Sequence, residues 1–200
     1  GTYLPDVTTT SVSAITSFSA LTGGNVVADG GETVAARGVC WSTSENPVIG
    51  GNQTSDGSGA GSYTSEITGL SANTTYYVRA YASNSVGTNY GEQISFTTPP
   101  SVTDYDGNVY EAVIIGNQVW MAENLKTTHY ANGSAMVDGT GAGNIDTDYT
   151  TKYYFNYNDN VSYVSAYGRL YTWAAVMNGE ASNNTNPSGV QGACHDGWHV

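Results

Sequence analysis

Short stretches of alternating polar and apolar residues, separated by clusters of Gly, Asn and Ser, run from Thr8 to Thr98. Alternation with period two places successive side chains on opposite faces of a β-strand. Short strands that recur at regular intervals with turn residues between them are typical of two packed β-sheets. The first half of the chain is therefore predicted to form a β-sandwich.

Two stretches show the alternation most clearly. Within residues 34–41, even-numbered positions share one face of a predicted strand and odd-numbered positions share the other. Within residues 76–81, the even-numbered side chains are expected to face inward, and the odd-numbered ones, Tyr81 among them, to face outward. A final strand is expected to carry Ile94 and Phe96.

A longer motif surrounds the second stretch. The segment from Leu70 to Ala80 reads LSANTTYYVRA, and it resembles the corner and following strand of fibronectin type III domains. Residues 38–44 and 80–91 resemble a variant of that family found in secreted bacterial multidomain proteins. The resemblance implies that Tyr76 is the corner tyrosine, whose hydroxyl binds nearby backbone.

Trp41 and Cys40 are adjacent residues of this predicted domain that each allow two interpretations. Trp41 could be a platform for a ligand, but a tryptophan beside an alternating strand more often packs within a core or between sheets. Cys40 could be a nucleophile, but this domain has no histidine to activate it, and free cysteines behave as small buried apolar groups. Packing is the favoured interpretation for both.

The sandwich is expected to end at Pro99-Pro100, because consecutive prolines cannot continue a central strand. The predicted organisation is a sandwich at residues 1–98, a proline-rich linker at 99–103 and a second module at 104–200. The second module opens with Asp-Gly and Gly-Asn turn pairs between apolar runs, which predicts two hairpins or a meander.

One helical pattern stands out in the second module. Leu170, Trp173, Ala174 and Met177 have the spacing of one helix face, and Asn178-Gly179 follows as a left-handed stop. The pattern predicts a helix of about three turns. Its apolar stripe is interpreted as a core face and not as a cofactor site. The predicted fold class is thus mainly β: a sandwich plus an α+β module with one helix.

Four segments of the second module closely resemble the Fibrobacter succinogenes major paralogous domain, a family of secreted bacterial modules. These segments are DGNVY at 106–110, IGNQVWMAENLKTT at 115–128, YGRLYTW at 167–173 and CHDGWHV at 194–200. The resemblance implies a C-type-lectin-like or sulfatase-modifying-factor-like architecture. It also implies that 104–200 is the N-terminal part of the domain, because in the family the last segment opens a further run of strands.

Charge restricts the partners of the chain. The sequence has 17 acidic and 5 basic residues, a formal net charge of −12, and this charge repels nucleic acid and anionic membrane surfaces. No stretch approaches the roughly 20 apolar residues of a membrane helix, so no membrane span is expected. Cys40 and Cys194 lie in different predicted domains, and no disulfide is expected between them.

Two oxygen-rich motifs could hold calcium: Asp104-x-Asp106-Gly-Asn108 and Asn144-x-Asp146-x-Asp148. Neither has the full calcium-loop pattern, and for Asp106-Gly107 a hairpin turn is favoured. A weak calcium site stays open as an alternative, and no other cofactor or metal is expected.

Catalysis has little support in the sequence. His129, His195 and His199 lack a metal-binding helical arrangement, and Cys194 beside His195 lacks an orienting acid. A cysteine-dependent oxidase would need residues beyond Val200. No catalytic, cofactor-binding or metal-binding residue is therefore assigned, and the chain is not expected to be an enzyme.

A tyrosine-rich stretch is the remaining feature of interest, and its rings could equally form a polar-rimmed core or a surface for sugars or proteins. The residues are Tyr149, Tyr153, Tyr154, Phe155, Tyr157, Tyr163, Tyr167 and Tyr171.

These features predict a non-catalytic structural or interaction protein that is extracellular or at a bacterial cell surface. Its partners would be other protein subunits or surface glycans, and not nucleic acid. Strand exchange between subunits, as in donor-strand fibres, would make it a filament subunit and a homo-polymer, whereas attachment to surfaces would make it an adhesin. The alternative is a carbohydrate-binding, lectin-like module.

Overall fold

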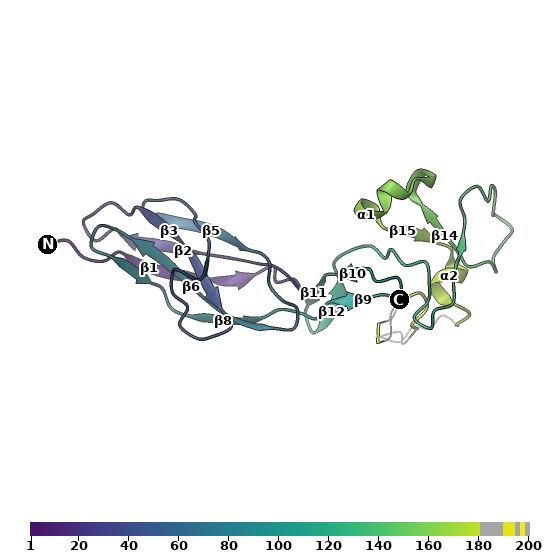
Figure 1. Cartoon of the computed structure of the whole chain (residues 1–200), viewed down its shortest axis with the longest axis horizontal. Coiled ribbons are helices and arrows are strands. Elements are labelled where there is room, and N and C mark those ends of the chain that lie inside the picture. The colour runs from purple at the N-terminus through teal and green to yellow at the C-terminus, as the bar shows by residue number, and fades with distance from the viewer. Residues whose placement is uncertain (181–189, 195–196, 199–200) are drawn as a thin grey trace. The chain divides into compact units, whose positions relative to one another are not determined.

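The computed structural model describes residues 1–180, 190–194 and 197–198. The chain is mainly β, as predicted, and contacts divide it into two compact units (Figure 1). Unit 1 comprises Gly1–Ser101 and Glu111–Trp120, and unit 2 comprises Val102–Tyr110 and Met121–Val200. Each unit is described separately below.

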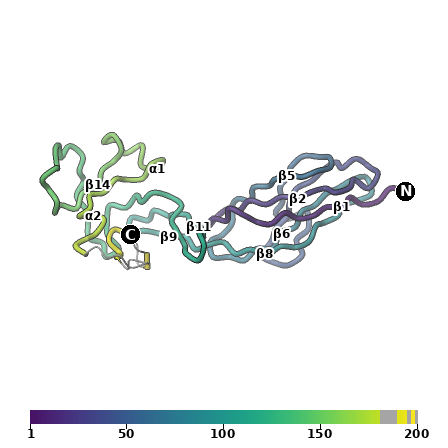
Figure 2. The backbone as a smooth tube through the Cα atoms, turned by 180° about the vertical axis from the view of Figure 1, so that it is seen from behind, coloured from purple at the N-terminus to yellow at the C-terminus, as the bar shows by residue number. Residues whose placement is uncertain are grey.

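The first sheet of unit 1 has the strand order β1-β2-β5, with β1 at Asp6–Ser13, β2 at Ala20–Ala28 and β5 at Gly61–Ile67. All its pairings are antiparallel, and the three strands run side by side in Figures 1 and 2. β2 needs glycine at Gly24, because a Cβ there would lie 2.5 Å from the Tyr63 hydroxyl oxygen. The backbone of β2 thus makes room for a tyrosine in the core.

The second sheet has the order β4-β3-β6-β7, with β8 also pairing with β6. β3 spans Ala36–Ser42, β4 Asn52–Gln53, β6 Thr75–Ser83, β7 Thr88–Tyr90 and β8 Ile94–Thr97. β7 and β8 pair with opposite ends of β6 and together form one interrupted edge strand. Three strands facing four strands is the arrangement of a fibronectin-type-III-like sandwich.

The core of unit 1 lies between these two sheets and confirms the inward face of β6. Val78 and Ala80 are fully buried and Tyr76 is 8% exposed. The other buried core side chains are Val7, Ala20, Val26, Val34, Val39, Tyr63, Ile67, Leu70, Ala82 and Phe96.

The prediction for Tyr81 was wrong in one respect. Its position on β6 is odd-numbered, as expected for the outer face, but its side chain is only 3% exposed. The hydroxyl donates a hydrogen bond of 2.7 Å to the carbonyl oxygen of Thr54, just after β4. The chain after β4 therefore covers the outer face of the sheet at this point.

Tyr76 is the corner tyrosine that the sequence predicted. The backbone N–H of Ser71 donates a hydrogen bond of 2.9 Å to its hydroxyl oxygen. The ring stacks on Phe96 of β8, with 5.9 Å between ring centroids. The hydroxyl therefore ties the turn before β6 to the strand itself.

A two-stranded hairpin completes unit 1. It joins β11 at Ala112–Ile115 to β12 at Gln118–Met121, through the Gly-Asn turn that the sequence predicted. Gly116 has a φ of 63°, which favours glycine there. The backbone N–H of Ala112 donates a 2.9 Å hydrogen bond to the Ser17 hydroxyl, and the hairpin as far as Trp120 belongs to the same unit as the sandwich.

Unit 2 contains the predicted Asp-Gly hairpin and a mixed sheet of three strands. The hairpin joins β9 at Val102–Thr103 to β10 at Val109–Tyr110. In the sheet, β14 (Tyr153–Asn156) lies between a parallel neighbour, β13 (Val137–Asp138), and an antiparallel neighbour, β15 (Arg169–Tyr171). A small core under this sheet contains Tyr130, Met136, Ala175 and Ala193, with Leu125, Tyr154 and Tyr171 packed against it.

The predicted three-turn helix was wrong in length. The helix is α2 at Trp173–Met177, and Leu170 belongs to β15 with 60% of its surface exposed. Leu170 is the cross-strand partner of Phe155, and the Thr172 side chain caps the helix by accepting a hydrogen bond from the N–H of Ala175. Strand pairing therefore takes the residues before Thr172 out of the helical pattern.

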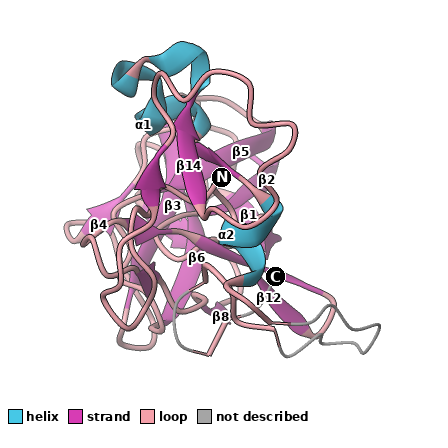
Figure 3. Cartoon of the chain, turned by 90° about the vertical axis from the view of Figure 1, so that its right-hand side faces the viewer, coloured by secondary structure: helices cyan, strands magenta, loops and turns pink. Residues whose placement is uncertain are grey.

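The predicted helix stop is confirmed, and the predicted core face is only partly so. Asn178 ends α2 in the left-handed conformation, with a φ of 49°. Met177 is buried and Ala174 is half-buried, but Trp173 is 69% exposed. The short helices of unit 2 are coloured cyan in Figure 3. Within the described residues, no helix is long and apolar enough to cross a membrane.

Candidate functional site

The tyrosine-rich stretch divides between the two interpretations that the sequence left open. Tyr154 and Tyr171 pack against the small core of unit 2. Tyr157, Tyr163 and Tyr167 instead have 49%, 39% and 55% of their surfaces exposed. The stretch therefore supplies both a core and a surface.

We call Tyr157, Tyr163 and Tyr167 the tyrosine triad. Their ring centroids lie 5.8 Å apart for Tyr157 and Tyr163, 5.3 Å for Tyr157 and Tyr167, and 5.8 Å for Tyr163 and Tyr167. The ring planes meet at 76°, 54° and 50° in the same order. These are the distances and angles of direct edge-to-face and tilted packing. The triad is thus one contiguous aromatic surface.

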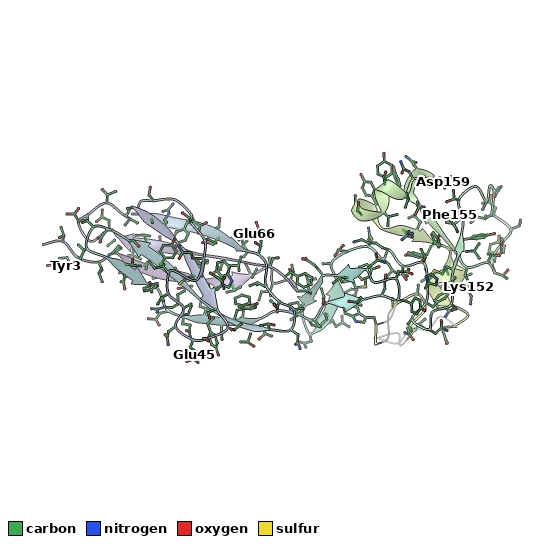
Figure 4. The ribbon with its side chains drawn as sticks, viewed as in Figure 1. Tyr3, Glu45, Glu66, Lys152, Phe155 and Asp159 are labelled. Atoms are coloured by element: carbon green, nitrogen blue, oxygen red, sulfur yellow. The ribbon has the colours of Figure 1, made fainter. Side chains whose placement is uncertain are left out.

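The triad is carried by the connection between β14 and β15. This connection consists of two 3₁₀ turns, η1 at Tyr157–Asp159 and η2 at Val161–Tyr163, followed by α1 at Val164–Tyr167. Figure 4 labels Phe155, on β14, and Asp159, in the first of these turns. One helical turn places Tyr163 and Tyr167 on the same side, because residues four apart share a helix face.

Local hydrogen bonds and left-handed residues shape the connection. Asn158 and Asp159 have φ values of 51° and 49° and reverse the chain after Tyr157. The Asn160 side-chain oxygen then accepts hydrogen bonds from the N–H and the hydroxyl of Ser162, at 3.0 and 2.8 Å. Asn and Asp tolerate these conformations better than other non-glycine residues.

The segment 124–126 braces the end of the connection. The Asn124 side-chain amide donates a 3.0 Å hydrogen bond to the carbonyl oxygen of Tyr167, and the N–H of Arg169 donates one of 2.9 Å to Leu125. Between them, Gly168 approaches so closely that a Cβ would lie 2.6 Å from the Cβ of Asn124. The triad therefore projects from a connection that is fixed at both ends.

A shallow cavity of about 330 Å³ lies between this bracing segment and α1. Its lining is mainly polar, and it includes an ion pair between Glu123 and Lys126. None of the triad rings lines it. The cavity residues are Ala122, Glu123, Asn124, Lys126, Ser165, Ala166 and Gly168.

The first motif considered for calcium is a hairpin turn, as favoured. The N–H of Gly107 donates to the carbonyl oxygen of Asp104, and the Asp104 carboxylate accepts hydrogen bonds from Asn108 and from the Tyr110 hydroxyl. The Tyr110 hydroxyl in turn accepts a 2.8 Å hydrogen bond from the N–H of Lys126. The Asp104 oxygens thus serve to join the turn to the segment at Lys126.

Asp106 holds the segment at Thr127 to His129. Its carboxylate accepts hydrogen bonds from the N–H and hydroxyl of Thr128, the hydroxyl of Thr127 and the Nδ1 of His129. Partial burial acts to raise the pKa of Asp106, but these hydrogen bonds outweigh burial and lower it below its usual value. The ring of His129 also lies 5.4 Å from that of Tyr105, so His129 has a structural role.

The second such motif is a series of turns. The Asn144 side-chain oxygen accepts from the N–H of Asp146, and Asp148 accepts from the N–H groups of Thr150 and Thr151. Hydrogen bonds from Thr151 and Thr150 lower the pKa of Asp148 to about 2. Within the described part of the chain, no group of three or more His, Cys, Asp or Glu residues could hold a metal ion.

Trp41 is half-buried and packs against the sandwich core, which agrees with its favoured interpretation. It also contributes to a cavity of about 460 Å³ under the loop between β3 and β4. Cys40 and Cys194 are both buried and free. Burial raises the pKa of the Cys40 thiol to about 11 and also raises that of Cys194. His195 and His199 lie outside the described residues.

Sequence reasoning missed the grouping of the triad and the exposure of the hairpin. Tyr163 and Tyr167 carried a signal in their i, i+4 spacing, but nothing periodic connects Tyr157 to them. In the β11–β12 hairpin, which the turn pairs predicted without any statement on its burial, large apolar side chains are exposed. These residues are Ile114 (55% exposed), Ile115 (61%), Val119 (40%) and Trp120 (51%).

A family model matches the second part of the chain. Residues 113–200 match the family model of the Fibrobacter succinogenes major domain, which confirms the resemblance seen in the sequence. None of the curated proteins matches this chain.

Several solved structures are similar to about half of the chain. One is the sixth fibronectin type III domain of human fibronectin type III domain containing protein 3, with 30% identity, a TM-score of 0.38, and coverage of 51% of this chain and 92% of that one. Another is the sensor domain of the anti-sigma factor RsgI4 of Pseudobacteroides cellulosolvens, with 17% identity, a TM-score of 0.38, and coverage of 50% and 99%. A third is the third fibronectin III domain of the human KIAA0343 protein, with 18% identity, a TM-score of 0.38, and coverage of 51% and 89%.

Proposed function

Since the chain joins a fibronectin-type-III-like sandwich to a Fibrobacter succinogenes major domain, we propose that it is a non-catalytic interaction protein of a bacterial surface. Both kinds of domain are common in extracellular proteins, and the proposed location is outside the cell or at its surface. The proposed organisation is the sandwich at 1–98, a linker at 99–103 and the second module at 104–200. A lectin-like architecture for that module stays a prediction.

The tyrosine triad is the observation that supports this function. Tyrosine combines a large apolar ring with a polar tip and loses little side-chain entropy on binding, so it is enriched at recognition surfaces. Three such rings with 39% to 55% of their surfaces exposed, on a connection fixed by its own hydrogen bonds, form a preorganised surface. The proposed role is attachment to an extracellular polymer, as in an adhesin.

A direct test is retention of the full chain on immobilised extracellular polymers, both polysaccharides and matrix proteins. We expect retention on at least one polymer, and loss of retention when all three triad tyrosines are replaced by serine. Tyr149→Ser is the matched control, because Tyr149 is 83% exposed in the same unit but is not part of the triad. A chain that is retained on none of them, or is retained equally after the triple substitution, would contradict the proposal.

A filament subunit is a second candidate function, and the β11–β12 hairpin favours it. Its four large apolar side chains are 40% to 61% exposed, and among the strands of the described residues β12 pairs with β11. Two-stranded sheets are marginally stable alone, and exposed apolar strands add further strands readily. The proposed contact is therefore between the hairpins of two copies.

Sedimentation of the full chain over a range of concentrations tests this second candidate. Self-association should be weakened by Ile115→Lys, which places a charge among the exposed apolar side chains. Val48→Lys is the matched control, since Val48 is also exposed (56%) and in unit 1, but in the loop between β3 and β4. A chain that stays monomeric at the highest concentrations would remove this candidate and leave the first intact.

A further inference from the structure

We propose that the tyrosine triad binds neutral polysaccharide chains by stacking their sugar rings on its exposed faces. This proposal rests on the proposed interaction function and specifies its ligand. A sugar ring has an apolar face of C–H groups and a rim of hydroxyls. A tyrosine side chain offers the complementary combination of an apolar ring face and a hydroxyl that donates and accepts hydrogen bonds.

The ring geometry determines where such a ligand can lie. The centroids are 5.3 to 5.8 Å apart, so the three rings contact one another and leave no room for a group between them. The accessible surface is therefore on the outer side of the cluster. Because the planes are mutually tilted, the edges of neighbouring rings support each ring, and the surface keeps its shape when a ligand covers it.

The hydrogen-bonding groups around the triad suit a ligand rich in hydroxyls. Within the described residues, the three tyrosine hydroxyls have no hydrogen-bond partner, whereas that of Tyr110 has two and that of Tyr171 has one. Asn158, Asp159 and Asn160 are exposed directly after Tyr157 and add amide and carboxylate groups. A hydroxyl can donate to the carboxylate and accept from the amides, so both kinds of group can be used at once.

Charge favours a neutral polymer over an acidic one. The stretch from Tyr153 to Gly168 contains no Lys or Arg, and its one formally charged side chain is Asp159. The nearby guanidinium of Arg169 lies over the Tyr154 ring and donates to the carbonyl oxygen of Lys126. On this stretch, a carboxylated or sulfated sugar would therefore meet the negative charge of Asp159 and no Lys or Arg side chain.

An organic cation is the main alternative ligand for an aromatic cluster. Cages for quaternary ammonium groups hold the cation over ring faces, each within about 6 Å of a ring centroid. In the triad, one ring meets another at 76° and at 5.8 Å, so an edge of one ring covers part of a face that a cage would need. The closed packing therefore favours stacking across the outside.

Isothermal titration calorimetry of the full chain with cellohexaose, xylohexaose and maltohexaose tests the proposal. We expect at least one of these neutral oligosaccharides to bind, with oligogalacturonate and choline giving no heat. Tyr163→Ala should lower the affinity about tenfold or more, as for an aromatic side chain at the centre of a binding surface. Tyr149→Ala should leave it unchanged.

One further variant keeps the test independent of folding. Tyr163→Phe keeps the ring and its contacts, so it should lose much less affinity than Tyr163→Ala. Binding that is unaffected by Tyr163→Ala, or binding of choline or oligogalacturonate in place of the neutral sugars, would overturn the proposal. Triad-dependent retention on a protein polymer, with no oligosaccharide binding, would overturn it while the proposed interaction function survives.

Discussion

Replacing Tyr76 by phenylalanine removes one hydroxyl and leaves the rest of the corner of the sandwich in place. The substitution keeps the ring, its burial and its stacking on Phe96. What it removes is the 2.9 Å hydrogen bond that the N–H of Ser71 donates to the hydroxyl oxygen. The expected effect is therefore the energy of that hydrogen bond alone.

The magnitude follows from the burial of the two partners. A typical hydrogen bond contributes about 0.5 to 1.5 kcal/mol, and a fully buried donor left without a partner costs about 1 to 3 kcal/mol. Tyr76 is buried, but Ser71 is exposed, so water can reach its N–H after the substitution. We therefore expect Tyr76→Phe to lower the free energy of unfolding by about 1 kcal/mol, the middle of the lower range.

Differential scanning calorimetry of the full chain would detect this change in the transition of the sandwich. For a domain of this size, about 1 kcal/mol corresponds to a fall of about 4 to 8 °C in Tm. Tyr77→Phe is the matched control, since Tyr77 is the next residue of β6 and its hydroxyl has no hydrogen-bond partner among the described residues. Equal shifts for the two variants, or none for Tyr76→Phe, would refute the reasoning.

Three other changes test different parts of the structure. In urea denaturation, Gly24→Ala should destabilise the sandwich by about 1 to 3 kcal/mol, because the new Cβ would lie 2.5 Å from the Tyr63 hydroxyl oxygen. Gly59→Ala is the control: the site has open space, so this substitution should act only through its backbone conformation. The pKa of Asp106 is lower in the folded state than in the unfolded state, so its ionised carboxylate stabilises the fold at any pH above its pKa in the unfolded state. This stabilisation is lost as the pH falls through the pKa of Asp106 in the folded state. Unit 2 should thus lose stability below about pH 4, and Asp106→Asn should flatten that dependence. Cys40, with a pKa of about 11, should alkylate more slowly than a free thiol at mildly alkaline pH, and equal rates would contradict its burial.

The sandwich could be predicted from the sequence because its signals are local. Period-two alternation identified the inward face of β6, and one motif identified the hydrogen bond of Tyr76. The burial of Tyr81 could not be predicted in this way, because it depends on the chain after β4, which is far away in sequence. Alternation assigns a side chain to a face of the sheet, but it does not say what covers that face.

In unit 2, local sequence patterns predicted the structure less well. Leu170 and Met177 fit a helical spacing, yet Leu170 pairs with Phe155 in a sheet, and pairing between distant segments leaves no trace in a local window. The triad has a similar origin. Tyr157 reaches Tyr163 and Tyr167 because Asn158 and Asp159 adopt left-handed conformations, which residue type permits but does not require.

The residues that fold the triad connection are different from the tyrosines that are proposed to bind a ligand. The hydrogen bonds that shape the connection come from Asn160, Ser162 and Asn124, and the tight approach to Asn124 requires Gly168. None of these bonds uses a tyrosine hydroxyl. Removing those hydroxyls should therefore leave the connection in place, because the exposed tips make little contribution to folding. The triad tyrosines are exposed, and within the described residues their hydroxyls have no hydrogen-bond partner, so they are available to a ligand. This is why the triad and not the small core is the surface to test.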